Sequence, residues 1–428
     1  MLSTLRNAWK ADDIRAKLLF VMFMILLYRL GNAVTVPYVD TALLSAHFTE
    51  IQDTMLGLLN TLSGSALERA SIFALSIQPY INASIIIQLL TFAVPALERL
   101  SKEGGEEGKR KIEKITRYST VAIAILQGFA FYIMIRDMGM LDPLATGFWT
   151  PIVIVLTFVT GSALLMWMGE QITEFGIGNG ISVILFVSIV ARFPTEVGMM
   201  ISGFIATPGN WWIYLLIAIG ALAIVVLIVV VTNAERRIPV QYSKRVVGRK
   251  MYGGQSTHLP MKVNMAGVLP IIFAQSIASV PATIAMFVPR WQDGWLMRNF
   301  DMTSIPYAVI YFLLIVFFSY FYSTVQFNPI EVANNLKKNG GFIPGFRAGK
   351  PTSEFLQKVL TKITLFGALY LAIIAVVPLL ISRFSETARD MGIMLGGTSI
   401  IIVVSVALET LKQLEAQLLM RHYKGFLE

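Results

Sequence analysis

Ten long apolar stretches recur along the chain, and they constrain its architecture more than any other feature. A helix that crosses a membrane needs roughly 20 mostly apolar residues. Windows of this kind lie near residues 18–36, 76–95, 115–136, 150–169, 180–199, 212–232, 267–289, 306–326, 360–382 and 394–411. Only 14% of the 428 residues are charged, compared with roughly 25% in soluble domains. The sequence therefore predicts an all-α polytopic membrane protein with ten transmembrane helices.

The positions of lysine and arginine orient these spans. Ten is an even number, so both termini lie on the same side of the membrane. Most of the basic residues lie on that side, in the two termini and in the loops near 96–117, 233–266 and 327–362. Because basic residues concentrate in cytoplasmic loops, the pattern predicts that both termini are cytoplasmic.

Residue types that several kinds of catalysis need are scarce or absent. The chain has no cysteine and three scattered histidines, which leaves out thiolate metal sites and cysteine nucleophiles. Inside the spans, Arg29 is the exception to an almost complete lack of ionisable residues. Coupled carriers ordinarily bind their ion through such residues. A passive conduit is therefore favoured, and a secondary transporter of a small solute is kept as the alternative.

Residues 59–95 combine two different segments. The second half is a membrane span, whereas the first is about one helix long and carries Gly64, Ser65, Glu68 and Arg69 between apolar residues. It is too short and too polar to span. Lipid tolerates such a re-entrant element only if protein or a water-filled cavity surrounds it. The sequence thus predicts a short re-entrant helix inside the bundle.

Polar uncharged residues follow one face of the second span. Ile77, Ile81, Ser84, Gln88 and Thr91 are spaced by alternating steps of four and three, which places them on one side of a helix. The seventh span similarly carries Ile272, Gln275, Ser276 and Ser279. Such residues commonly join helices by hydrogen bonds within lipid. The other interpretation is that these two helices face each other across a seam that opens.

Two long basic loops, 233–266 and 327–362, carry glycine turns with apolar residues between them. Basic loops beside a membrane often only satisfy topology or contact anionic lipid. Loops longer than about 12–15 residues are frequently functional. These two are therefore also candidates for a folded docking surface for a large acidic partner.

Six runs of sequence carry a more specific signal. They are SGSALERASIFALSIQPYINASIIIQLL, KEGGEEGKRKIEKITRY, GEQITEFGIGNGIS, QSTHLPMKVNMAGVLP, FNPIEVANNLKKNGGFIPGFRAGKPT and GGTSIIIVVSVALE. In this order they resemble the bacterial SecY family, the central subunit of the protein-conducting channel, over essentially the whole chain. Ala348 departs from the proline common in the family at its position.

This resemblance implies two pseudo-symmetric five-helix halves, 1–205 and 206–428, around a central pore with a plug helix at about residues 60–73. The implied pore ring is Ile77, Ile81, Ile181, Leu185, Ile272 and Ile402. The implied plug residues include Asn60, Leu62, Ser65, Leu67, Arg69 and Phe73. The lateral gate would lie between spans two and three and spans seven and eight, with Ser84, Gln88, Thr91, Gln275, Ser276 and Ser279 along it.

The resemblance also implies partners and a location. The docking residues for the SecA ATPase or the ribosome would be Arg236, Arg237, Lys244, Arg245 and Arg347. The expected function is translocation of unfolded secretory polypeptides across the bacterial plasma membrane and lateral release of membrane segments into lipid. SecE, and often SecG, accompany the family's channel subunit. No cofactor, metal or catalytic site is expected. A scaffold that only recruits cytoplasmic partners through its basic loops is a third hypothesis.

Overall fold

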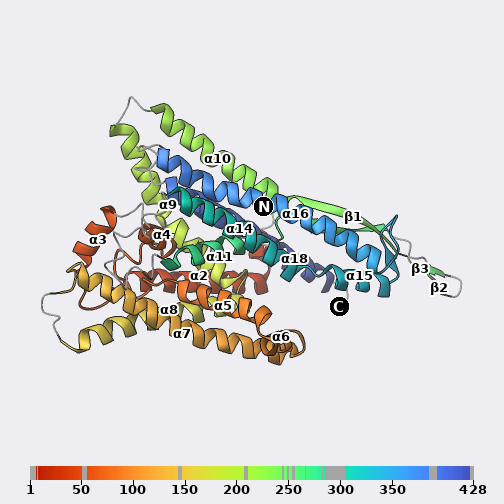
Figure 1. Cartoon of the computed structure of the whole chain (residues 1–428), viewed down its shortest axis with the longest axis horizontal. Coiled ribbons are helices and arrows are strands. Elements are labelled where there is room, and N and C mark those ends of the chain that lie inside the picture. The colour runs from red at the N-terminus through yellow and green to blue at the C-terminus, as the bar shows by residue number, and fades with distance from the viewer. Residues whose placement is uncertain are drawn as a thin grey trace.

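The protein is described by a computed structural model that covers residues 6, 8–50, 55–142, 147–206, 211–242, 245–247, 250–252, 256–265, 267–281, 284, 304–384 and 393–424. Its helices are α2 (Asp12–Asn32), α3 (Thr41–Glu50), α4 (Met55–Leu62), α5 (Gln78–Ala93), α6 (Pro95–Lys102), α7 (Gly105–Asp137), α8 (Trp149–Phe175), α9 (Gly180–Ala206), α10 (Trp211–Asn233), α11 (Leu269–Ala278), α14 (Ile305–Gln326), α15 (Pro329–Lys338), α16 (Lys350–Phe384) and α18 (Ile393–Lys424). The strands are β1 (Glu235–Tyr242), β2 (Arg245–Val247), β3 (Lys250–Tyr252), β4 (Ser256–Lys262) and β5 (Gly341–Phe342). The strands project at one end of the helical bundle, and α3 and α4 lie toward the other end (Figure 1).

The helices confirm a polytopic all-α membrane fold. Among the described residues, seven helical stretches are long and apolar enough to cross a membrane, or eight if the bent pair α5 and α6 forms one span. The seven belong to α7, α8, α9, α10, α14, α16 and α18. Helices α2 and α11 occupy the predicted first and seventh spans, and part of the seventh lies outside the described residues. The exact number of ten spans and the division at residue 205 stay predictions.

The second predicted span is shorter than expected and ends in a sharp bend. Helix α5 stops at Ala93, and the axis of α6 is turned by 103° from it. Val94 between them is extended, with φ −108° and ψ 111°. Proline disfavours helical geometry in the residue before it but is well suited to the first turn of a helix. Pro95 therefore ends one helix and begins the next.

The prediction of a helix over residues 60–73 was wrong. The helix is α4, which ends at Leu62, and turns occupy most of residues 63–77. The Gly64 and Ser65 amides donate back to the Thr61 and Asn60 carbonyls at 3.1 and 2.9 Å, which is the Schellman closure of a helix. Gly64, Ser65 and Ala70 have positive φ values of 67°, 67° and 43°, so a right-handed helix cannot continue through them.

The two long basic loops form a single folded unit. Strand β1 of the first loop pairs with β4 of the same loop and with β5 of the second loop in an antiparallel sheet of order β4-β1-β5, and β2 and β3 form a separate two-stranded sheet. Alternate residues of β1, Ile238 and Val240, point inward and pack with Met261 and with Leu356 and Leu360 of α16. Since α16 continues into the bundle, this sheet is attached directly to a membrane-length helix.

Candidate pore, re-entrant segment and gate

All six predicted ring residues contact one apolar cluster at the centre of the bundle. Five of them are buried in it, and Ile181 packs against it while remaining partly exposed. The buried five are Ile77, Ile81, Leu185, Ile272 and Ile402. Two of the six converge on α8: a Cβ placed on Gly169 would lie 3.6 Å from the Cδ1 of Ile77 and 3.5 Å from the Cγ1 of Ile181. The structure gathers these side chains, and their lining of a pore stays a prediction.

Residues 60–73, here called the re-entrant segment, are largely buried. Of the predicted plug residues, Asn60, Leu62, Leu67 and Phe73 are buried, Ser65 is partly buried, and Arg69 is exposed. The Asn60 side chain closes the turn, because its Nδ2 donates to Glu68 Oε2 at 2.7 Å and its Oδ1 accepts from the Glu68 amide at 3.1 Å. The segment thus carries internal polar contacts that a lipid environment could not supply.

The far end of the re-entrant segment is paired with the chain that follows α2. The Val36 amide donates to the Ala70 carbonyl at 2.8 Å, and the Ile72 amide donates to the Val34 carbonyl at 3.0 Å. The rings of Phe73 and Tyr28 stack with centroids 5.8 Å apart. These contacts satisfy backbone groups in a region without regular helix, as burial requires.

One buried arginine contradicts the sequence-based view that Arg29 is the exception inside the spans. Arg192 lies within the predicted fifth span, on α9, and only 7% of it is exposed. Its Nη1 donates to Thr61 Oγ1 of α4 at 2.9 Å. Sequence reasoning missed it because a single charge changes the average hydropathy of the apolar run 180–199 very little. An arginine within an apolar helix is itself the signal that could have revealed it.

The helices predicted to form the gate meet at Tyr322 of α14. Its hydroxyl donates to the Oε1 of Gln88 on α5. Its ring lies 5.0 Å from that of Phe273 on α11, in an edge-on arrangement. Nearby, the rings of Phe92 on α5 and Phe321 on α14 make another edge-on contact, with centroids 5.1 Å apart. Tyr322 was not among the predicted gate residues, because nothing in its local sequence distinguishes it from the other tyrosines and phenylalanines of α14.

The remaining predicted gate residues differ in their contacts. Thr91 donates to the Ile87 carbonyl at 2.7 Å, and Ser84 accepts from Gln88 Nε2 at 3.4 Å, so both bonds lie within α5. On α11, the side chains of Gln275 and Ser276 are buried, and Gln275 Nε2 and Ser276 Oγ have no hydrogen-bond partner among the described residues. Unpartnered polar atoms weaken the packing of α11, because each costs roughly 1–3 kcal/mol when buried.

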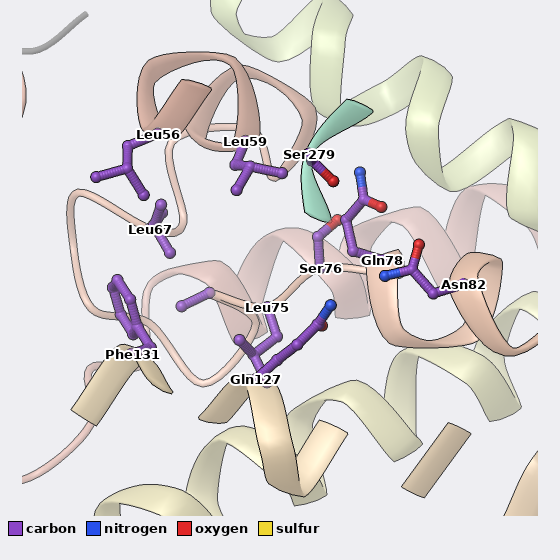
Figure 2. A pocket seen from close by; sticks show the side chains of 11 residues that line it. Leu56, Leu59, Leu67, Leu75, Ser76, Gln78, Asn82, Gln127, Phe131 and Ser279 are labelled. Atoms are coloured by element: carbon purple, nitrogen blue, oxygen red, sulfur yellow. The ribbon is translucent and has the colours of Figure 1, made fainter. Parts of the chain in front are cut away.

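A cavity lies between the re-entrant segment and helices α5, α7 and α11. The volume of the cavity is about 50 Å³. Figure 2 shows that its lining is divided, with polar side chains gathered on one side and apolar side chains on the other. The polar group is Ser76, Gln78, Asn82, Gln127 and Ser279. Predicted gate residue Ser279, which caps the end of α11, therefore lines this cavity beside the re-entrant segment.

The predicted docking residues are distributed over the folded unit that the two basic loops form, here called the sheet unit, which contains the β4-β1-β5 sheet and the β2-β3 pair. Arg236 and Arg237 are exposed on β1, Arg245 belongs to β2, and Arg347 is exposed before α16. Arg237 Nε is 2.7 Å from the Glu235 carboxylate. Lys244 lies outside the described residues. Because β5 pairs with β1, the basic residues of the two loops belong to the same folded unit, whose surface is called the platform below.

Comparison with known proteins agrees with these features. The SecY family profile matches residues 71–411. The SecY translocase subunits of Streptomyces scabiei and Streptomyces coelicolor are 45% and 44% identical, and each alignment covers all of both chains.

The described part of the chain contains no group of three or more histidine, aspartate or glutamate residues arranged to hold a metal ion.

Solved structures show the same fold at lower identity. A protein-conducting channel superposes with a TM-score of 0.68 at 17% identity and covers 94% of this chain and 92% of its own. A SecY whose plug domain was studied superposes with a TM-score of 0.65 at 18% identity, with the same coverage. Sec61 from a canine ribosome–channel complex superposes with a TM-score of 0.64 at 16% identity, with the same coverage. The chain is a member of the SecY family.

Proposed function

We propose that this chain is the channel through which unfolded secretory polypeptides cross the bacterial plasma membrane and from which membrane segments pass into lipid. The observation that carries the proposal is the gathering of six branched apolar side chains, including Ile81 and Ile402, against a buried re-entrant segment. A narrow apolar constriction excludes ions by dewetting. It also offers no specific binding site to a passing chain, as a channel for many sequences requires.

The re-entrant segment acts as a plug in this proposal. It blocks the outer side of the ring while the channel rests, and the contacts of Tyr28 and Arg192 hold it there. The published structure concerned with a SecY plug domain describes that plug as stabilising the closed state and maintaining a membrane seal. The same role fits a segment that is internally hydrogen-bonded and is also bonded to Tyr28 of α2 and Arg192 of α9.

The seam between α5 and the pair α11 and α14 is the proposed lateral gate. One tyrosine–glutamine hydrogen bond and edge-on aromatic contacts join it, and the polar groups of α11 are poorly satisfied. Each such interhelical bond contributes only about 0.6–2 kcal/mol in a membrane. A hydrophobic signal sequence that replaces these contacts can therefore open the seam at modest cost.

Docking of a motor or ribosome to the sheet unit supplies the energy, because the proposed channel has no catalytic site of its own. The exposed basic residues Arg236, Arg237 and Arg347 support an acidic partner surface. One structural neighbour belongs to a ribosome–channel complex. We further propose SecA as the alternative partner, SecE and often SecG as companion subunits, and cytoplasmic termini, as the basic loops favour.

Site-specific crosslinking tests the pore directly. The chain has no cysteine, so Ile81→Cys introduces a unique thiol at the proposed constriction. A secretory chain stalled halfway through the reconstituted channel is expected to crosslink to it. Leu222→Cys on α10, where the side chain is 69% exposed on the outside of the bundle, is the control and is expected to stay unlinked. Equal labelling of both sites, or no labelling of Ile81→Cys in an active complex, would contradict the pore assignment.

A further inference from the structure

One stripe of α9 carries both the proposed ring and a set of polar contacts. Ile181, Leu185, Ser188 and Arg192 follow steps of four, three and four, which place them on one face of the helix. The first two belong to the predicted ring, and the last two contact the re-entrant segment or the groups that hold it. The arrangement of constriction and plug contacts therefore depends on a single rigid element.

The first polar contact joins Arg192 to α4. Its Nη1 donates to Thr61 Oγ1 at 2.9 Å, and Thr61 Oγ1 in turn donates to the Gly57 carbonyl at 3.0 Å. Thr61 is 1% exposed and Arg192 is 7% exposed. A buried guanidinium is costly unless it is hydrogen-bonded. The bond thus ties α9 to the helix that begins the re-entrant segment.

The second contact lies one turn earlier on α9. The hydroxyls of Ser188 and Tyr28 are 2.6 Å apart, and Tyr28 donates to the Ser63 carbonyl at 3.0 Å. The backbone itself comes close here, since a Cβ on Gly64 would lie 3.1 Å from the Cα of Ser188. Consecutive turns of α9 therefore hold residues 61–64, where the helix ends and the re-entrant turns begin.

We infer that Arg192 is a latch that holds the re-entrant segment in its closed position through Thr61. This inference rests on the proposed channel function. Such a contact must be strong enough to hold the segment in the closed state and must break without a large cost when the channel opens. The Arg192–Thr61 pair meets both requirements. Hydrogen bonds made by charged groups are stronger than neutral ones, yet the acceptor here is a neutral hydroxyl. When the segment leaves, water enters and solvates the guanidinium, so the open state is not penalised by a stranded buried charge.

Resting ion conductance measures the latch. Purified complex, reconstituted with its companion subunits into planar bilayers in potassium chloride, is compared with Arg192→Met and Thr61→Val. Thr61→Val leaves the buried guanidinium without this acceptor and is expected to raise the open fraction of the resting channel about tenfold or more. Arg192→Met is expected to raise it by less, because it also removes the cost of burying the charge. Thr61→Ser, which keeps the hydroxyl, is expected to stay close to wild type. Arg136→Met, which removes an exposed arginine from the end of α7, is the charge control.

The double variant separates a latch from two unrelated defects. If Arg192 acts through Thr61, Arg192→Met with Thr61→Val is expected to leak no more than the worse single variant. The inference would be overturned if the increases in leak of the two single variants multiplied in the double variant, or if both single variants leaked no more than wild type. Thr61→Val keeps the side-chain shape, so it provides the test even if Arg192→Met does not fold. Translocation of a secretory protein is measured in parallel: its absence in wild type would count against the channel function, whereas the leak comparison alone decides the latch.

Discussion

Glycine at two positions lets the re-entrant segment approach its neighbours. A Cβ on Gly161 of α8 would lie 1.8 Å from the Ile72 carbonyl oxygen, and one on Gly31 of α2 would lie 2.0 Å from Cε2 of Phe73. Neither distance is possible for real atoms. A backbone carbonyl cannot rotate away as the end of a side chain can, so the contact at Gly161 is the more restrictive one.

Gly161→Ala is therefore expected to displace the re-entrant segment. Overpacking of this kind costs about 1–3 kcal/mol, which should lower the melting temperature and raise the resting conductance. The matched control is Gly220→Ala on α10, where a Cβ meets nothing within 4 Å. Alanine is favoured over glycine within a helix by about 1 kcal/mol, so the control should be neutral or slightly stabilising. A stable, non-leaking Gly161→Ala channel would contradict the close approach.

Single residues also show what the sequence could predict. The stripe from Ile77 to Thr91 was visible because helical periodicity fixes which side chains share a face, and Gln88 does contact the opposing helix. Its partner Tyr322 could not be foreseen, since the two are 234 positions apart. Arg192 was overlooked for a different reason: a single charge does little to an averaged hydropathy window, although it dominates the energetics of burial.

Between elements, the seam of α5 with α14 depends on few polar contacts. Tyr322→Phe removes the hydroxyl that bonds Gln88 and keeps the ring against Phe273. The loss of about 1 kcal/mol should let the seam open more readily. We expect more frequent translocation of secretory proteins with weakened signal sequences, measured in vesicles. Tyr320→Phe is the control, because Tyr320 lies on the same helix but bonds Thr361 of α16. If Tyr322→Phe and Tyr320→Phe increased translocation equally, the increase would not be caused by the seam between α5 and α14.

The sheet unit is a second element whose integrity can be tested. Val240 of β1 is 2% exposed and packs in the apolar cluster between the sheet and α16. Val240→Asp buries an unpaired charge, so the sheet should detach from α16. Motor-driven translocation is expected to fall severely, while resting conductance stays at the wild-type level. Gln241→Asp, one residue further on the exposed side of β1, is the control. Increased leakage in Val240→Asp would indicate that the platform also supports the seal.

The sequence-based prediction of helices failed where the backbone conformation of a few residues ended a helix early. The apolar spacing of residues 59–73 is helical, but the conformations of Gly64, Ser65 and Ala70 end the helix after Leu62. Ser65 and Ala70 carry no sequence signal for a positive φ, which is uncommon outside glycine. The bend at Val94, in contrast, was readable from Pro95. The two loops were predicted as folded, but their pairing with each other was not predicted. It is made by strand β5, which has only two residues and therefore shows no periodic pattern in the sequence.

At the scale of the whole molecule, the re-entrant segment separates sealing from transport. Deletion of residues 60–73 removes the segment but none of the six ring side chains. Translocation is therefore expected to continue while resting ion conductance rises, because only the ring remains as a barrier. Paired measurements of conductance and preprotein import on the same vesicles test this. Unchanged conductance would contradict a sealing role for the segment.

Helix α16 joins two parts of the molecule that have different tasks. Its first turns, with Leu356 and Leu360, pack in the sheet unit, and its later turns, with Ala372 and Ala375, pack in the central cluster. From Lys350 to the proline at 378 it extends about 42 Å at 1.5 Å per residue. A tilt of about 5° at the Lys350 end would move the far end by roughly 4 Å, given that length. The helix can therefore work as a lever, which converts a small push on the platform into a displacement comparable to the width of a side chain.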